Sequence, residues 1–145
     1  MILELVALLC TGLFAGAAIY VSLVEHPARL ECGPALAIAE FGPSYRRGAV
    51  MQASLAGGGC LAAVAAWTQG STTLVLIAGL LLGSAVPFTL LVILPTNKRL
   101  LDAGLDRGAP EAAALLARWG RLHAVRSVVS GVAFLLLGMH RSGIL

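Results

Sequence analysis

Four long apolar stretches occupy most of the chain, at residues 2–24, 49–67, 74–94 and 127–139. Two polar segments, residues 25–47 and 98–126, connect the first stretch to the second and the third to the fourth. An apolar run of about 18 or more residues is long enough to cross a bilayer as a helix. Three stretches meet that length, and the fourth meets it if its helix begins upstream. The pattern predicts an all-α integral membrane protein.

The expected fold is an up-down-up-down four-helix bundle, because short connections make consecutive helices antiparallel. We predict membrane spans at about residues 2–25, 44–67, 73–94 and 120–140, within a single domain that comprises residues 1–145. The fourth helix should extend back to about residue 110, because Pro110 is typical of a first helical turn. Charged residues make up only 12% of the chain, about half the share of a soluble domain.

The basic residues predict which side of the membrane each connection occupies. Nine of the ten Lys and Arg residues lie in the two polar segments, and only Arg141 lies elsewhere. Because basic residues near span ends stay cytoplasmic, the two long loops should be cytoplasmic and both termini outside. We therefore predict a multi-pass protein of the cell inner (plasma) membrane, in contact with the lipid bilayer. No nucleic-acid binding is expected, because the basic residues flank helices and form no soluble basic face.

Prolines predict where the helices end. The residue before a proline disfavours the helical conformation, so the first helix should end before Pro27 and the third at Pro95. Residues 27–42 should form a cytoplasmic loop with room for a short helix at residues 35–41, and the second helix should start near residues 43–44. Pro87 should kink the third helix.

Small residues predict close helix packing. Gly12 and Gly16 lie four residues apart, as do Gly79 and Gly83, and residues 57–59 are all glycine. At such spacings helix backbones can approach closely in lipid. These faces can pack helices within one bundle or join copies of the chain, so a homo-oligomer is one of the two arrangements that the sequence allows.

Polar side chains gather at the predicted cytoplasmic ends of all four helices. The set comprises Glu25, His26, Tyr45, Arg46, Arg47, Thr89, Thr96, Asn97, Lys98, Trp119, His123, Arg126 and Ser127. Trp119, His123 and Arg126 share one helical stripe with the serines that follow. Because polar groups that face lipid are costly, this stripe should face the bundle interior. The sequence predicts a polar site inside this end of the bundle.

The residue types in this set suggest distinct roles. Four residues are candidates for catalysis, because imidazole moves protons and guanidinium stabilises anions: His123, Arg126, His26 and Glu25. Alternatively, these four form a structural ion-pair network, since charges within membranes usually pair. Three residues are candidates for cofactor binding: Asn97, Arg46 and Trp119. The alternative for Trp119 and Tyr45 is a role as interfacial aromatics. The other basic residues at span ends suit snorkelling anchors, namely Arg47, Lys98, Arg99, Arg118 and Arg121.

A metal site is a further alternative. His26 and His123, with Glu25 or Asn97, offer nitrogen and oxygen ligands that suit iron, copper or zinc. No HxxxH, ExxH or CxxC spacing supports such a site locally. The cofactor therefore stays open between a transition metal, haem and none.

Four strings in the chain resemble the signature regions of a known family. They are Glu25-His26-Pro27-Ala28, Tyr45-Arg46-Arg47-Gly48, Val86-Pro87-Phe88-Thr89 with Pro95-Thr96-Asn97, and Arg118-Trp119 through His123-Ala124-Val125-Arg126. In order and spacing they resemble the anthrone oxygenase-like membrane family, much of which carries only an unknown-function label. The resemblance implies a small four-helix membrane protein. Fungal members are linked to oxidation of an anthrone to an anthraquinone, which implies an oxidoreductase or oxygenase acting on a lipophilic anthrone- or quinol-like molecule.

A mechanism consistent with this resemblance starts with an apolar phenolic substrate that enters from the lipid. His123 or His26, held by Glu25, removes a proton, and Arg126, with Arg46, stabilises the enolate. The enolate can then pass an electron to dioxygen without a metal.

Two alternative functions are a non-catalytic module that binds or carries a small lipophile, haem or a metal ion, and a structural helper whose polar cluster only locks helix packing. The chain lacks Walker, GxSxG, dinucleotide-binding and CxxCH motifs.

Overall fold

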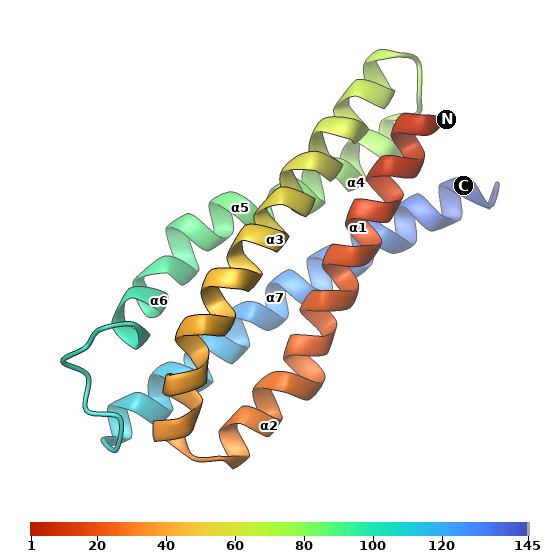
Figure 1. Ribbon diagram of the computed structural model, residues 1–145. Helices are drawn as coiled ribbons and strands as arrows, with labels where there is room; N and C mark the ends of the chain where they lie inside the picture. The colour runs from red at the N-terminus through yellow and green to blue at the C-terminus, as the bar shows by residue number, and fades with distance from the viewer. Residues whose placement is uncertain (145) are drawn as a thin grey trace.

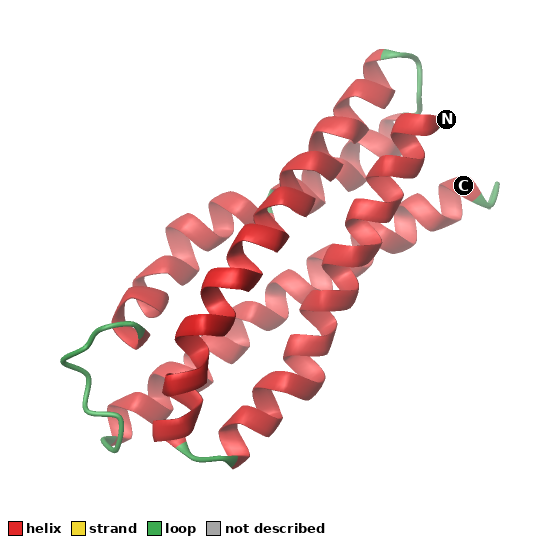
Figure 2. Cartoon of the chain, viewed as in Figure 1, coloured by secondary structure: helices red, strands yellow, loops and turns green. Residues whose placement is uncertain are grey.

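The computed structural model describes residues 1–144 and contains four long helical rods packed side by side (Figure 1). The rods are Ile2–Glu31, Pro34–Thr68, Thr73–Leu100 and Pro110–Arg141, and each is long and apolar enough to cross a membrane. No strand occurs within the described residues (Figure 2). This architecture confirms the predicted all-α four-helix fold and indicates a multi-pass membrane protein.

Turns and short breaks divide the rods into elements. The first rod comprises α1 (Ile2–Tyr20), a π-helical turn η1 (Val21–Glu25) and α2 (His26–Glu31), and the second is α3 (Pro34–Thr68). The third rod comprises α4 (Thr73–Gly83), α5 (Ala85–Phe88), a π-helical turn η2 (Thr89–Ile93) and α6 (Leu94–Leu100), and the fourth is α7 (Pro110–Arg141). Both α1 and α4 pack against α3 and α7, so the rods form a closed ring.

Consecutive rods run antiparallel, and both ends of the chain lie at one end of the bundle (Figure 1). We call this part of the molecule the terminal half. The opposite part, which contains the turn between α2 and α3 and the loop at residues 101–109, is called the loop half. The two halves share all four rods, so any difference between them arises from the side chains along each rod.

Each π-helical turn lies directly before a proline in the interior of a rod. Pro27 follows two residues after the end of η1, and Pro95 follows two residues after the end of η2. A proline donates no N–H, and its ring clashes with the carbonyl four residues earlier. A π turn relieves this clash: the N–H of His26 donates to the carbonyl of Val21, five residues earlier. With this adjustment both rods continue as helices through their prolines.

These continuous rods contradict several predicted boundaries. We predicted that the first helix ends before Pro27, that residues 27–42 form a loop, and that Pro95 ends the third helix. These predictions are wrong, because only Cys32 and Gly33 interrupt the helical backbone between the first two rods, and α3 starts earlier than predicted. The predictions assumed that a proline stops a helix. In the structure a π-helical turn precedes each proline, so the backbone continues as a helix.

Contacts between small residues pack the terminal half. A Cβ added to Gly79 would lie 2.2 Å from the Cβ of Ala63, so α3 and α4 approach backbone to backbone. A Cβ added to Gly83 would lie 2.7 Å from the Sγ of Cys60. Gly16, in contrast, has no atom within 4 Å of such a Cβ. Only some of the predicted small-residue faces are therefore used inside this chain.

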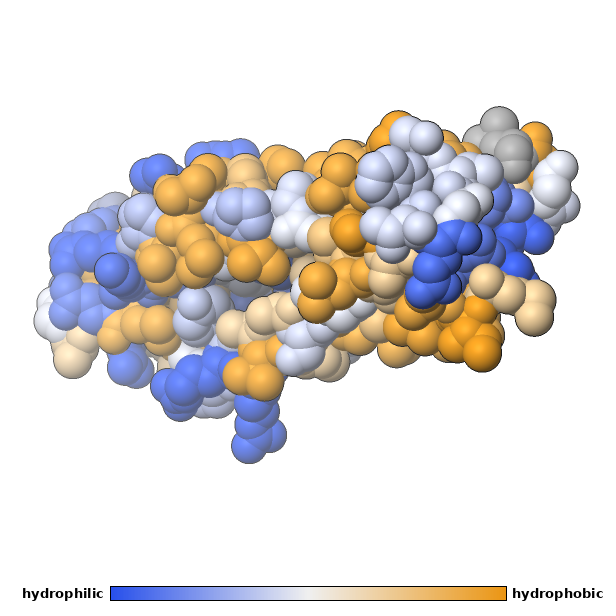
Figure 3. Space-filling view, turned by 90° about the horizontal axis from the view of Figure 1, so that it is seen from above, coloured by the Kyte–Doolittle hydropathy of each residue, from blue (hydrophilic) through white to orange (hydrophobic). Residues whose placement is uncertain are grey.

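The surface agrees with a membrane environment. Hydrophobic side chains cover the middle of the face seen in Figure 3, and hydrophilic ones gather toward its ends.

Polar contacts hold the loop at residues 101–109. The backbone N–H of Gly104 donates to Asp102 Oδ1 at 2.9 Å, which lowers the pKa of that carboxyl. Arg99 binds both Asp102 and Glu111, so it connects the loop at residues 101–109 to α7. The exact limits of the membrane spans remain predictions.

Candidate functional site

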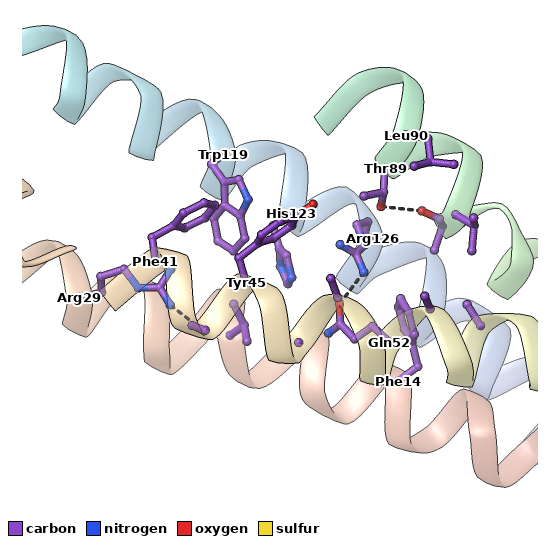
Figure 4. A pocket seen from close by; sticks show the side chains of 18 residues that line it. Phe14, Arg29, Phe41, Tyr45, Gln52, Thr89, Leu90, Trp119, His123 and Arg126 are labelled. Atoms are coloured by element: carbon purple, nitrogen blue, oxygen red, sulfur yellow. Dashed lines mark hydrogen bonds between the residues drawn. The ribbon is translucent and has the colours of Figure 1, made fainter. Parts of the chain in front are cut away.

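A cavity of about 190 Å³ lies inside the loop half, between η1, α3, α5, η2 and α7 (Figure 4). Most of its wall is apolar or aromatic, and both π-helical turns contribute to it. The polar side chains in the lining are Arg29, Ser44, Tyr45, Gln52, Thr89, His123 and Arg126. An apolar chamber that carries a few polar groups is typical of a small-molecule binding site.

His123 lines the cavity from α7. Its side chain is buried, and its Nδ1 lies 3.1 Å from the Oγ of Ser22 on η1. Trp119, one turn earlier on α7, stacks on the imidazole with ring centroids 4.7 Å apart and an interplanar angle of 27°. The ring is therefore held on one face and at one nitrogen, and Nε2 is the nitrogen left for a bound molecule.

Arg126 lies one turn after His123 and lines the same cavity. Its Nη2 donates to Gln52 Oε1 on α3 at 2.5 Å, and its guanidinium lies over the ring of Phe14, 5.4 Å from the centroid. Within residues 1–144 no carboxylate lies within 4.0 Å of this guanidinium. Its Nε is buried and has no hydrogen-bond partner. A cation without an anionic partner inside a bundle is costly, so this position suits the negative charge of a ligand.

Arg29, in contrast, has its charge compensated at the end of the cavity. Its Nη2 donates to Glu25 Oε1 at 2.5 Å, and its Nε forms an ion pair with Glu40 Oε2 at 2.5 Å. The second approach is too oblique for a hydrogen bond. The guanidinium faces the rings of Phe41 and Trp119, 5.9 and 5.8 Å from their centroids. This network connects α2 to α3 and closes the cavity toward the loops.

His26 does not meet His123 in the cavity. Its ring packs against Trp119 with centroids 5.0 Å apart, and Trp119 in turn stacks on His123. His26 is buried, and neither of its ring nitrogens has a hydrogen-bond partner of good geometry. A Cβ added to Gly120 would lie 2.6 Å from His26 Nε2, so glycine at this position makes room for the imidazole. Both predicted catalytic histidines therefore pack against the same indole, and only His123 lines the cavity.

The predicted metal ligands are not brought together. Glu25 binds Arg29, so it does not hold His26 as we predicted. Each of the two imidazoles packs against Trp119. In the part of the chain that the structure describes, no three His, Cys, Asp or Glu side chains form a group that could hold a metal ion. His26, His123 and Glu25 therefore do not fit a shared metal site.

Of the three residues predicted to bind a cofactor, only Trp119 lines the cavity. Asn97 is buried in α6 with its Oδ1 unpaired, but it is not part of the lining. Arg46 is exposed on α3, where a long basic side chain suits a snorkelling anchor. The role predicted for Arg46 beside Arg126 has no support in this geometry.

Several residues that contact the site were missed in the sequence, among them Gln52, Ser22 and Phe14. Gln52 stands in an apolar stretch, and a polar residue at membrane depth usually faces the interior and marks a functional position. That signal could have identified it. Ser22 gives a weaker signal of the same kind, because a serine can also bond to its own helix backbone. Nothing in the sequence distinguishes Phe14 from the other apolar residues of the first stretch.

The chain is similar to one known family over most of its length. The family described as "Anthrone oxygenase" matches residues 41–136, a range that includes Gln52, His123 and Arg126. The anthrone oxygenase tpcL of Aspergillus fumigatus is 36% identical over 129 residues, and the match covers 81% of this chain and 80% of that relative. No solved structure matches the chain at a significant level.

Proposed function

The chain belongs to the anthrone oxygenase family, and from this premise we propose that it is a membrane-embedded oxygenase. Its substrate is a lipophilic aromatic molecule of the anthrone or quinol type, and it binds in the cavity of the loop half. One observation carries this proposal: His123 and Arg126 lie side by side in a mostly apolar chamber, and Arg126 has no carboxylate partner among the described residues.

The first step that this pair can perform is proton removal. In an anthrone, the methylene group lies between two aromatic rings that are conjugated to a ketone, so loss of a C–H proton gives a stabilised enolate. His123 Nε2 takes that proton as a general base. The Arg126 guanidinium, held by Gln52, lies against the enolate oxygen and stabilises the negative charge as it develops.

Dioxygen completes the reaction. The electron-rich enolate reduces dioxygen, and a carbon–oxygen bond forms at the deprotonated carbon. The proton held by His123 returns to the bound oxygen, and loss of water leaves the second carbonyl of an anthraquinone. One oxygen atom enters the product and the other leaves as water, so no further oxidant is required.

Flat aromatic walls suit a planar substrate. Phe14, Phe41, Tyr45 and Trp119 all line the cavity. Phe41 and Tyr45 are stacked, with ring centroids 5.7 Å apart and an interplanar angle of 6°. Aromatic rings favour offset-stacked or edge-to-face contacts, and these walls offer both to a fused-ring molecule. Such contacts orient the substrate toward His123.

A groove on the outside of the bundle supports access from the lipid. It runs between α1 and α3 and shares Val21, Ser44, Gly48 and Gln52 with the cavity. Gly48 has no atom within 4 Å of an added Cβ, so this junction is open. A substrate dissolved in the bilayer reaches the cavity through this groove. In this proposal the loop half faces the cytoplasm and both termini lie outside the inner membrane.

Anthrone itself is the substrate with which to test this function. Purified protein in lipid nanodiscs should consume oxygen and form anthraquinone faster than nanodiscs without protein. His123→Ala and Arg126→Ala should each lower kcat by about 10²-fold or more. Arg121→Ala is the matched control, because Arg121 is an exposed arginine on the same helix. Equal activity in all three variants overturns the assignment, and anthrone binding without oxidation favours the carrier function.

A further inference from the structure

A line of hydrogen bonds connects His123 to the backbone of α1 through two serines. Ser22 Oγ lies 3.1 Å from His123 Nδ1 and 2.7 Å from Ser127 Oγ. Ser127 Oγ donates to the carbonyl of Ala18 at 2.8 Å and also lies 3.4 Å from the carbonyl of His123. Ser22 is the one hydrogen-bond partner of His123 Nδ1 within residues 1–144. The arrangement lies between η1 and α7, beside the cavity.

The protons on these groups determine the direction of each bond. A hydroxyl carries one proton, and a backbone carbonyl can only accept. Ser127 Oγ has the carbonyl of Ala18 as an acceptor at 2.8 Å, and when its proton goes there, Ser127 Oγ accepts from Ser22. The Ser22 proton is then used, so Ser22 Oγ accepts a hydrogen bond from His123. In this arrangement His123 Nδ1 carries a proton.

We propose that Ser22 is a positioning residue that fixes the tautomer of His123. In the neutral ring, a proton on Nδ1 leaves the lone pair on Nε2. Nε2 is the nitrogen available to the cavity, so His123 meets a ligand as a proton acceptor before any substrate binds. The inference rests on the proposed function in one respect: in that function the lone pair on Nε2 acts as the general base.

The local fold explains why the hydroxyl of Ser22 can fix the tautomer of His123. His123 and Ser127 are four residues apart on α7, so they lie one above the other on the same face. That face packs against η1, the π-helical turn that precedes Pro27, and Ser22 belongs to this turn. A buried N–H without an acceptor is unfavourable. A proton on Nδ1 has Ser22 Oγ as an acceptor, whereas a proton on Nε2 has no acceptor within residues 1–144.

Nitrogen NMR reads this tautomer directly and needs no substrate. The full chain, labelled with nitrogen-15 histidine, is placed in lipid nanodiscs at a pH where the His123 ring is neutral. The His123 signals, assigned by comparison with His26→Gln and His140→Gln variants, should show the proton on Nδ1. A wild-type protein with the His123 proton on Nε2 overturns the inference.

Serine variants test the role of Ser22 itself. Ser22→Ala removes the acceptor, so the dominant tautomer should change to the one with the proton on Nε2. With anthrone as substrate, kcat should fall about 10²-fold while KM changes little. Ser22→Thr keeps a hydroxyl and should keep the wild-type tautomer. Ser130→Ala is the matched control, because Ser130 is a buried serine on α7 that bonds to the carbonyl of Ser127.

The two readouts separate this inference from the proposed function. An unchanged tautomer in Ser22→Ala contradicts the role of Ser22, whatever the activity. A proton on Nδ1 that moves in Ser22→Ala, in a protein that does not oxidise anthrone, supports the inference and counts against the proposed function.

Discussion

The two halves of the bundle consist of the same four rods but pack in different ways. In the terminal half, α3 and α4 touch through Gly79 and Ala63, and the buried cluster there consists mostly of alanine. In the loop half, large side chains such as Phe41 and Trp119 separate the rods and leave the cavity between them. Side-chain size along each rod thus determines where space for a ligand exists.

The halves also differ in how their polar groups are paired. In the terminal half, Glu4 accepts a hydrogen bond from Ser71 at 2.7 Å and lies 3.6 Å from Arg141. In the loop half, His26 and Arg126 keep buried nitrogen atoms without partners. Proteins tolerate such incomplete pairing mainly at functional sites. The comparison suggests that the terminal half provides stability and the loop half provides chemistry.

The largest effect on stability should come from the compensated arginine of the loop half. Arg29→Ala removes a buried guanidinium that donates to Glu25 and packs against Phe41 and Trp119, and it should lower the free energy of unfolding by about 3 kcal/mol. Arg126→Ala removes a charge that has no carboxylate partner and should cost about 1 kcal/mol. Reversible unfolding in mixed micelles measures both values. Equal losses of unfolding free energy would mean that Arg126 contributes as much to stability as Arg29 does.

The next largest effect should come from the close contact of the terminal half. Gly79→Ala places a methyl group against Ala63, so α3 and α4 must separate, at a cost of about 1–3 kcal/mol in unfolding free energy. Gly57→Ala is the matched control, because Gly57 has no atom within 4 Å of an added Cβ. The same unfolding measurement applies. A stable Gly79→Ala variant would show that the two helices are not held by this contact.

A smaller effect should follow when the open junction of the loop half is filled. Gly48→Leu places a side chain where the cavity meets the outer groove and should lower kcat/KM for anthrone about tenfold or more. Gly57→Leu makes the same change on α3, and Gly57 is not part of the cavity lining. Oxygen consumption compares the two variants. Equal kcat/KM values would place the substrate outside this cavity.

The smallest effect should come from the exposed partner of Arg29. Glu40→Gln removes one carboxylate of the network but leaves the bond from Arg29 to Glu25 in place. An exposed ion pair contributes less than about 1 kcal/mol, so the free energy of unfolding should change by less than this amount. A loss as large as that of Arg29→Ala would show that Glu40, and not Glu25, carries the network.

The number and type of the helices could be predicted because apolar length is a property of each segment alone. The polar stripe of α7 could also be predicted, since Trp119, His123 and Ser127 are four residues apart and all three are buried. The helix ends could not, because the helices continue through Pro27 and Pro95 by way of the π-helical turns that precede them, and nothing in the sequence marks those turns. The hydrogen bonds and ion pairs between rods were missed for a different reason, because residue type does not reveal the distance between side chains on different helices.

Residue order and hydropathy by themselves determined that this protein is a bundle of four apolar helices with its polar chemistry at one end. Only the tertiary structure decided which charges are compensated, since Glu25 could reach His26 or Arg29 and packing selected Arg29. It also placed His26 outside the cavity that His123 lines and left Arg126 without a carboxylate among the described residues. The physical reason is that hydropathy acts on each segment separately, whereas charge pairing and hydrogen-bond direction depend on distances between segments.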